Sequence, residues 1–261
     1  MMGQPAALYG PSVGGQDETV AAPTRVLLAQ GALVLAGFLA GAEAVVVASR
    51  TPGYSVASSS VWAIALLVLA GWALVSAGIL LLRKAENRAA GVLLSLAGIT
   101  WLIAESDSPG ARSALVFGAG VVMATVTPVL VAHAVLRMKG GLATVEAAAV
   151  VLAYGCTVLV AGLGKALFFD PGTAGCNNCP ANPWLVLDSP ATVAAIDALT
   201  VVLGLVWSGF LVAVLVLRSI SYTPAQRRVL VPATAIAIGY LMGLFTVERG
   251  ESVMQGLVAL R

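Results

Sequence analysis

The chain has 261 residues, of which 59% are hydrophobic and only 10% are charged. Soluble domains carry about 25% charged residues, because a fold in water needs a charged surface. The composition therefore excludes an ordinary soluble domain and predicts an all-α, polytopic transmembrane helical bundle with the lipid bilayer as its partner. The net charge of +2 gives no strongly basic face, so no nucleic acid partner is expected.

The N-terminal segment is rich in Gly, Pro and Ala and precedes the first long apolar run. We predict that residues 1–25 form a short disordered tail. A cleaved signal peptide is not expected, because its apolar region spans about 7–15 residues and the run after Arg25 is longer.

Runs of apolar residues between charges predict seven membrane spans. About 20 apolar residues cross roughly 30 Å of hydrocarbon, and backbone groups without water partners must pair within a helix. Together the spans form a transmembrane domain over residues 26–247, followed by a short tail at 248–261. This tail is a candidate truncation point, and the alternatives are a truncated kinase and a stand-alone protein. The predicted spans are Val26–Ala48, Val61–Leu82, Ala89–Ala104, Ser113–Leu136, Leu142–Leu163, Val193–Leu217 and Val229–Val247.

The basic residues at the span ends predict the orientation, because cytoplasmic loops carry an excess of Lys and Arg. One set of ends carries nine of the 14 basic residues and the other set carries five. We therefore predict a multi-pass cell-membrane protein with a cytoplasmic N-terminus and an extracytoplasmic loop at 164–192. The nine are Arg25, Arg83, Lys84, Arg88, Arg137, Lys139, Arg218, Arg227 and Arg228.

That loop contains a Cys-x-x-Cys pair, Cys176 and Cys179. In an oxidising compartment a disulfide is the default, which predicts a structural staple for a Gly- and Pro-rich loop. A redox-responsive or ligand-sensing pair and a metal site are the alternatives. Structural zinc takes four ligands, and neither a His nor a further Cys lies nearby, so no metal is expected.

Ionisable residues inside spans are costly and need partners. His133 and Glu146 lie at similar depth on either side of a short turn, so we predict that they are neighbours, either as a static pair or as a proton-sensitive switch. At the opposite ends, Glu43, Lys165 and Asp197 either cluster at the mouth of a ligand or ion cavity or reach water individually.

Two prolines interrupt predicted spans, Pro128 in the fourth and Pro232 in the seventh. Proline removes a helical hydrogen bond and kinks the helix, so both are hinge candidates. The sequence has no phosphate-binding loop, no His-Glu-x-x-His and no Gly-x-Ser-x-Gly, and its single histidine excludes a bis-His haem within one chain. We predict no enzyme activity and no cofactor.

The fifth loop also carries a family resemblance. Phe-Phe-Asp-Pro at 168–171, Cys-Asn-Asn-Cys-Pro at 176–180 and Asn-Pro-Trp-Leu-Val at 182–186 are followed by a span and the basic pair Arg227 and Arg228. This arrangement is similar to the N-terminal membrane region of actinobacterial sensor histidine kinases, over residues 164–246. The resemblance implies a two-component signal-transduction input, a homodimer and a cytoplasmic kinase or response-regulator partner. The family's phosphoacceptor and ATP-binding domains have no counterpart in this sequence.

Three hypotheses follow. The first is a membrane sensory or input domain without a catalytic domain, in which the cysteine loop or the cavity receives an outer signal. The second is a small ion- or proton-coupled transporter or permease that uses Glu43, Asp197, Glu146 and His133. The third is a membrane redox component that uses Cys176 and Cys179.

Overall fold

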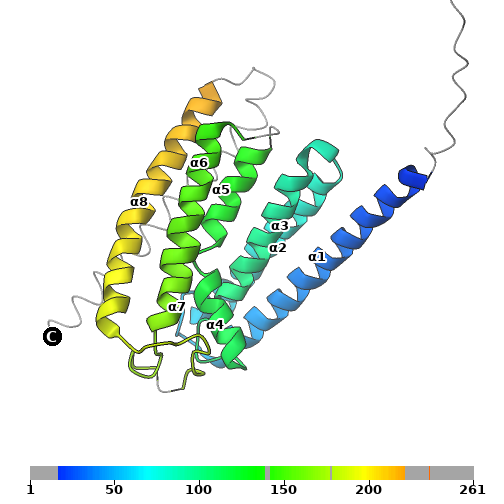
Figure 1. Cartoon of the computed structure of the whole chain (residues 1–261). Coiled ribbons are helices and arrows are strands. Elements are labelled where there is room, and N and C mark those ends of the chain that lie inside the picture. The colour runs from blue at the N-terminus through cyan, green and yellow to red at the C-terminus, as the bar shows by residue number, and fades with distance from the viewer. Residues whose placement is uncertain (1–16, 139–141, 177, 221–234, 236–261) are drawn as a thin grey trace, which may run out of the picture.

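The computed structural model describes residues 17–138, 142–176, 178–220 and 235. Over these residues the chain is built from helices and contains no strand, which confirms the all-α prediction. The helices run up and down between two ends of a bundle (Figure 1). We call the end with residues 105–113 and 169–189 the disulfide end, and the end with residues 83–87 the far end.

Three long helices form an N-terminal unit: α1 (Asp17–Arg50), α2 (Val61–Leu82) and α3 (Arg88–Ala104). Short 3₁₀ turns, η1 (Ala57–Ser59) and η2 (Ala85–Asn87), lie in the connections. The start of α2 is fixed by Ser60, whose hydroxyl accepts a hydrogen bond from the Ala63 amide. Because α1 begins at Asp17, residues 17–25 are helical, and the predicted disordered tail is wrong for this part.

The remaining described helices form a C-terminal unit, and among them α8 alone is a long, unbroken α-helix. Its elements are α4 (Ala114–Met123), α5 (Thr127–Arg137), α6 (Thr144–Tyr154), η3 (Gly155–Gly164), α7 (Lys165–Phe168) and α8 (Pro190–Ile220). Proline suits the first helical position of α8, since its missing N–H needs no partner there. The preceding Ser189 accepts a hydrogen bond from the Thr192 amide.

Five helical stretches are long and apolar enough to cross a membrane, and a sixth results if α4 and α5 count as one bent span. The count of seven is not reached over the described residues, because the predicted span Val229–Val247 lies outside them. The first six expected spans each overlap one of these stretches, and α2 has the predicted bounds Val61–Leu82.

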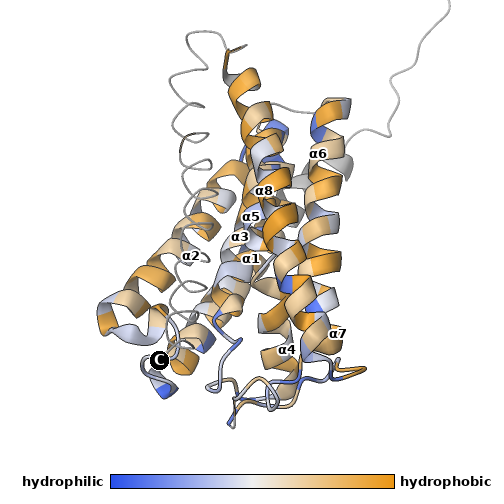
Figure 2. Cartoon of the chain, turned by 90° about the vertical axis from the view of Figure 1, so that its left-hand side faces the viewer, coloured by the Kyte–Doolittle hydropathy of each residue, from blue (hydrophilic) through white to orange (hydrophobic). Residues whose placement is uncertain are grey.

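The apolar surface of these helices supports a bilayer environment. In α2, only 17% of the most apolar stretch is buried inside the protein. Large apolar side chains such as Trp62, Leu66 and Leu69 therefore point outwards. Figure 2 shows hydrophobic residues along the length of the helices and more hydrophilic residues in the loops. In water this surface would be unfavourable, whereas lipid tails cover it without a penalty.

Glycines bring α2 and α3 into backbone contact. Gly71 and Gly78 on α2 face Gly98 and Gly91 on α3, and a Cβ added at Gly98 would collide with the Gly71 carbonyl oxygen. Small residues allow this approach, which maximises van der Waals contact where lipid offers no hydrophobic drive. The N-terminal unit is therefore closely packed along this seam.

Candidate functional site

The C-terminal unit contains a break between α4 and α5. The two helices are bent by 51° relative to each other, and Pro128 lies in the first turn of α5. Proline cannot donate a backbone hydrogen bond, so a helix that reaches it tends to end or kink just before. The bend thus falls next to the predicted hinge residue Pro128. The second hinge candidate, Pro232, lies outside the described residues.

Opposite the break, the helix that begins as α6 loosens into a π-helix, η3. Its Thr157 carbonyl oxygen lies 2.9 Å from the hydroxyl of Thr125, a residue of the break. A Cβ added at Gly162 would approach this hydroxyl and the Val122 carbonyl oxygen, so a glycine permits the close packing. Irregular helix turns of this kind are frequent at functional sites.

The connection between α3 and α4 is folded into the protein rather than lying on its surface. Ser106 and Ser108 are each 1% exposed. Gly110 packs against the Val47 carbonyl of α1, and Gly120 of α4 packs against the backbone of Ser106 and Asp107. Small residues at these points let the loop pass between α1 and α4. This brings the Asp107 carboxylate into the bundle.

A cavity of about 250 Å³ lies where these irregular segments meet α7 and α8. Its wall combines charged, hydroxyl-bearing and apolar side chains from the α3–α4 loop, α4, α5, η3, α7 and α8. The lining residues are Asp107, Val121, Ala124, Thr125, Pro128, Cys156, Thr157, Ala161, Lys165, Asp197, Thr200, Gly204 and Trp207.

The charged groups of the cavity are Asp107, Lys165 and Asp197. The Lys165 Nζ lies 3.3 Å from Asp197 Oδ1 and 5.6 Å from the centre of the Phe169 ring. Burial raises the pKa of Asp107, and the positive charge of Lys165 lowers it by a smaller amount. Burial therefore disfavours the charged form of Asp107.

A second carboxylate lies next to Asp107 in the same loop. Glu105 accepts a hydrogen bond from the Ser55 hydroxyl of the α1–α2 connection. Burial is the largest influence on Glu105 and raises its pKa, the Ser55 hydrogen bond lowers it, and the negative Asp107 raises it. The negative charge of Asp107 thus acts on its neighbour Glu105 in the same loop.

The predicted cluster of Glu43, Lys165 and Asp197 forms in part. Lys165 and Asp197 make an ion pair in the cavity wall, whereas the residues lining the cavity do not include Glu43. Glu43 is half-buried on α1, and one of its carboxylate oxygens is buried without a hydrogen-bond partner among the described residues. Asp107 takes the place in the cavity that we expected for Glu43.

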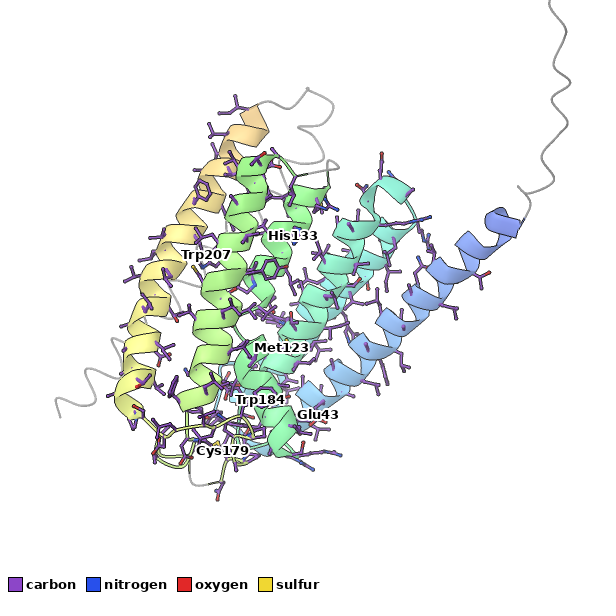
Figure 3. The ribbon with its side chains drawn as sticks, viewed as in Figure 1. Glu43, Met123, His133, Cys179, Trp184 and Trp207 are labelled. Carbon is purple, nitrogen blue, oxygen red and sulfur yellow. A yellow bond between two sulfur atoms is a disulfide. The ribbon has the colours of Figure 1, made fainter. Side chains whose placement is uncertain are left out.

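His133 and Glu146 each have a different partner in the structure from the one predicted. His133 Nδ1 lies 3.3 Å from the Tyr154 hydroxyl. Glu146 Oε2 accepts a hydrogen bond from the Ala143 amide at the start of α6. A glutamate in the first turn stabilises a helix in this way. Figure 3 labels His133 on α5, towards the far end, and Glu43 towards the disulfide end.

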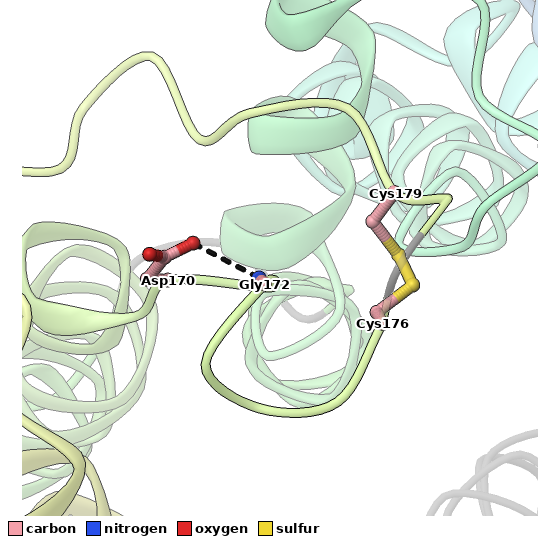
Figure 4. The surroundings of a disulfide bond; sticks show 4 residues. All are labelled: Asp170, Gly172, Cys176 and Cys179. Atoms are coloured by element: carbon pink, nitrogen blue, oxygen red, sulfur yellow. Dashed lines mark hydrogen bonds between the residues drawn. A yellow bond between two sulfur atoms is a disulfide. The ribbon is translucent and has the colours of Figure 1, made fainter.

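Cys176 and Cys179 form a disulfide in the connection between α7 and α8. The bond lies beside the turn in which Asp170 Oδ1 accepts a hydrogen bond from the Gly172 amide (Figure 4). Gly175 has φ +88°, a conformation that suits glycine and that turns the chain into Cys176. Among the described residues, no three His, Cys, Asp or Glu side chains gather as a metal site.

Asn182 attaches this loop to the helices. Its side-chain amide donates to the Ala166 carbonyl at 2.6 Å and to the Phe169 carbonyl at 2.8 Å, and its oxygen accepts from the Trp184 amide. The buried Asn182 thereby satisfies carbonyls at the end of α7, which begins with Lys165 of the cavity. The disulfide loop and the cavity are joined through one short helix.

Sequence reasoning missed Asp107, Thr200 and Trp207 as cavity residues. The signal for Asp107 was the run of small residues around it, Ser-Asp-Ser-Pro-Gly-Ala, which fits a loop that packs inside the protein. Thr200 and Trp207 gave no signal, because each is ordinary within an apolar helix. Cys156 is buried and also lines the cavity.

Comparison of the chain with protein-family models, with curated proteins and with solved structures finds no match. The geometry of the cavity is therefore the structural basis for a functional proposal.

Proposed function

We propose that this chain is a membrane sensory or input protein, whose cavity receives a small ligand or ion from outside the cell. The observation that carries the proposal is the placement of the Lys165–Asp197 ion pair in a cavity bounded by the α4–α5 break. A change in that ion pair would act directly on segments that are already bent or loosened. Broken helices can adopt two packings that differ by a few kcal/mol, which is the basis of many switches.

The similarity of residues 164–246 to the membrane region of sensor histidine kinases supports the same proposal. In this proposal, the disulfide end faces the outside of the cell. The far end transmits the change in helix packing to a cytoplasmic kinase or response-regulator system. The disulfide anchors the outer loop, and Asn182 connects that loop to α7 and its Lys165.

One experiment tests coupling between the two ends. Asp197→Asn removes the ion pair with Lys165, and Asp188→Asn is the matched control, because Asp188 is an exposed carboxylate that contacts Thr173 in the loop. Hydrogen exchange in lipid nanodiscs should change at the far ends of α5 and α8 in Asp197→Asn and not in the control. A change confined to the disulfide end would contradict the sensory proposal.

Orientation is tested separately with a membrane-impermeant thiol reagent on intact cells, in a Cys156→Ala background. We expect Cys176 and Cys179 to be labelled only after reduction of their disulfide. Labelling that requires permeabilised cells would place this loop in the cytoplasm and overturn sensing from outside.

Transport is the second candidate, and it is favoured by the depth of the cavity. Cys156 and Trp207 of its wall lie near the middle of the stretches Thr144–Phe168 and Pro190–Leu217. Sites near the membrane centre beside broken helices are typical of transporters. Proteoliposomes loaded with a pH dye distinguish the two functions, since proton flux that depends on Asp107 would favour transport and its absence would favour sensing.

A further inference from the structure

We propose that the cavity binds a small organic cation, an amine with one positive charge and a short apolar body, next to the Asp107 carboxylate. This inference rests on the proposed function, because it names the ligand class of the same cavity.

The charge of the cavity wall is the first argument. Among the described residues that line it, Asp107 and Asp197 are acidic and Lys165 is basic, so this part of the wall carries one negative charge in excess when all three are ionised. The side chains of Lys165 and Asp197 are 33% and 52% exposed, so water screens that pair. The charge of Asp107 is penalised by burial, and such a charge is costly without a partner. A ligand with one positive charge removes the imbalance, whereas an anion would increase it.

The pairing of these groups shows where the cation would lie. Lys165 is bound to Asp197 at 3.3 Å. The Asp107 carboxylate makes no hydrogen bond or ion pair with any residue that the structure describes, although burial and the positive charge of Lys165 both shift its pKa. An ammonium group is both a charge partner and a hydrogen-bond donor for such a carboxylate.

The hydroxyl groups of the wall favour a donor ligand. Thr200 Oγ1 is buried and lacks a hydrogen-bond partner among the described residues, although it belongs to the cavity wall. The hydroxyls of Thr125 and Thr157 lie close enough to backbone carbonyls to donate to them, so their oxygens remain acceptors. The wall thus offers acceptors to an N–H donor.

Size and apolar lining separate an amine from a metal ion. The cavity volume of about 250 Å³ equals that of roughly eight waters, at about 30 Å³ each. Val121, Pro128 and the buried Trp207 provide apolar contacts, and an aromatic ring attracts a weakly hydrated ammonium group. No set of three metal-ligating side chains accompanies Asp107 among the described residues.

The pH dependence follows from the groups that face Asp107. These are Lys165 with its partner Asp197 across the cavity, Glu105 in the same loop, and Tyr54, whose pKa is raised by burial and by the Asp107 charge. Protonation of Asp107 would remove the excess negative charge. Affinity for the amine should therefore rise with pH through the raised pKa of Asp107 and level off above it.

The test uses the full chain in lipid nanodiscs and three probes with the same four-carbon body: n-butylammonium, n-butanol and butyrate. Calorimetry should show butylammonium binding about tenfold more tightly than butanol, a difference of about 1.4 kcal/mol, because a charge-assisted hydrogen bond is stronger than a neutral one. It should show no binding of butyrate. Equal binding of all three probes, or tighter binding of butyrate, would overturn the proposal.

Variants locate the cation. Asp107→Asn should weaken butylammonium binding about tenfold and abolish its pH dependence, and Thr200→Val should weaken it a few-fold. Glu86→Gln at the far end is the control, since Glu86 is exposed and remote from the cavity. If Asp107→Asn does not fold, the proposal is tested by the pH dependence of butylammonium affinity in the unmodified protein and by the affinity of Thr200→Val. An affinity that does not change with pH and is not lowered in Thr200→Val would contradict the proposal.

The experiments distinguish an error in the proposed ligand class from an error in the proposed sensory function. Absent butylammonium binding, together with altered exchange at the far ends in Asp197→Asn, would reject the amine and leave the sensory proposal intact. Butylammonium binding without any change at the far ends, in the wild type or in Asp197→Asn, would support the amine and reject sensing.

Discussion

The N-terminal and C-terminal units are both built from apolar helices, but the helices pack differently in the two units. In the N-terminal unit, glycines on α2 and α3 bring two regular helices into backbone contact. In the C-terminal unit, a 51° break, a π-helix and an inserted loop leave a cavity with three charged side chains. The contrast indicates that the regular, closely packed helices form a rigid part of the bundle, while the irregular backbone of the C-terminal unit leaves space for polar groups.

The difference also concerns where polar groups find partners. In the N-terminal unit the indole N–H groups of Trp72 and Trp101 donate to the Gly37 and Leu67 carbonyls across helix contacts. In the C-terminal unit the Asp107 carboxylate and the Thr200 hydroxyl line a cavity and make no hydrogen bond with another described residue. Glu43 and Asn87 of the N-terminal unit also have a buried oxygen without a described partner, but neither lines this cavity. Ligands and protons can reach the polar groups that line the cavity, so the C-terminal unit is expected to be the more easily perturbed by ligands and by pH.

The largest effect should come from breaking the glycine contact. Gly98→Leu introduces a side chain where the Gly71 backbone carbonyl cannot give way, so the free energy of unfolding should fall by about 3 kcal/mol or more. Gly209→Leu is the control in the C-terminal unit, since nothing lies within 4 Å of a Cβ there. Unfolding in mixed micelles measures both, and equal losses would refute the contrast between the units.

Removing the attachment of the disulfide loop should have the next largest effect. Asn182→Ala leaves the Ala166 and Phe169 carbonyls without this donor, which should cost about 2–3 kcal/mol. Hydrogen exchange should increase at α7 and in residues 169–189, while α2 and α3 stay protected. Loss of protection throughout both units would show that they unfold together.

Reduction of the Cys176–Cys179 disulfide should destabilise the protein less. The bond closes a short loop with a sequence separation of three residues, and a loop of that length limits the entropic stabilisation to at most about 2 kcal/mol. A Cys176→Ser, Cys179→Ser variant should reproduce the melting temperature of the reduced protein. If the variant melts lower than the reduced protein, the serine hydroxyls disturb the loop beyond the loss of the bond.

The smallest effect is the pH dependence of stability. The pKa of Asp107 is raised by burial above its ordinary value of 3.8, so the folded protein binds more protons than the unfolded chain between the two values. Stability from this group is full below pH 3.8 and declines as pH rises through the raised pKa, by at most about 1.4 kcal/mol per pH unit. In Asp107→Asn the free energy of unfolding should decline less with rising pH. If the slope is the same as in the unmodified protein, the decline comes from Glu105 instead of Asp107.

The sequence by itself determined the helical class and most of the helix positions. Charges and apolar runs are local, and a helix that crosses lipid must satisfy its own backbone, so α2 appears at the predicted Val61–Leu82. Pro128 likewise predicted a break close to the one observed between α4 and α5. This was possible because proline lacks the backbone N–H wherever it occurs, so its effect on a helix can be read from the sequence. The cysteine spacing also led to the expected disulfide.

Only the tertiary structure decided which polar residues share the cavity. Lys165 and Asp197 meet because α7 and α8 are adjacent, and Asp107 joins them because Gly110 and Gly120 let its loop pass between α1 and α4. His133 likewise lies beside Tyr154, a residue that sequence depth alone did not single out. Depth in the membrane can be estimated from one helix at a time, whereas the facing of side chains depends on how the helices rotate and pack against one another.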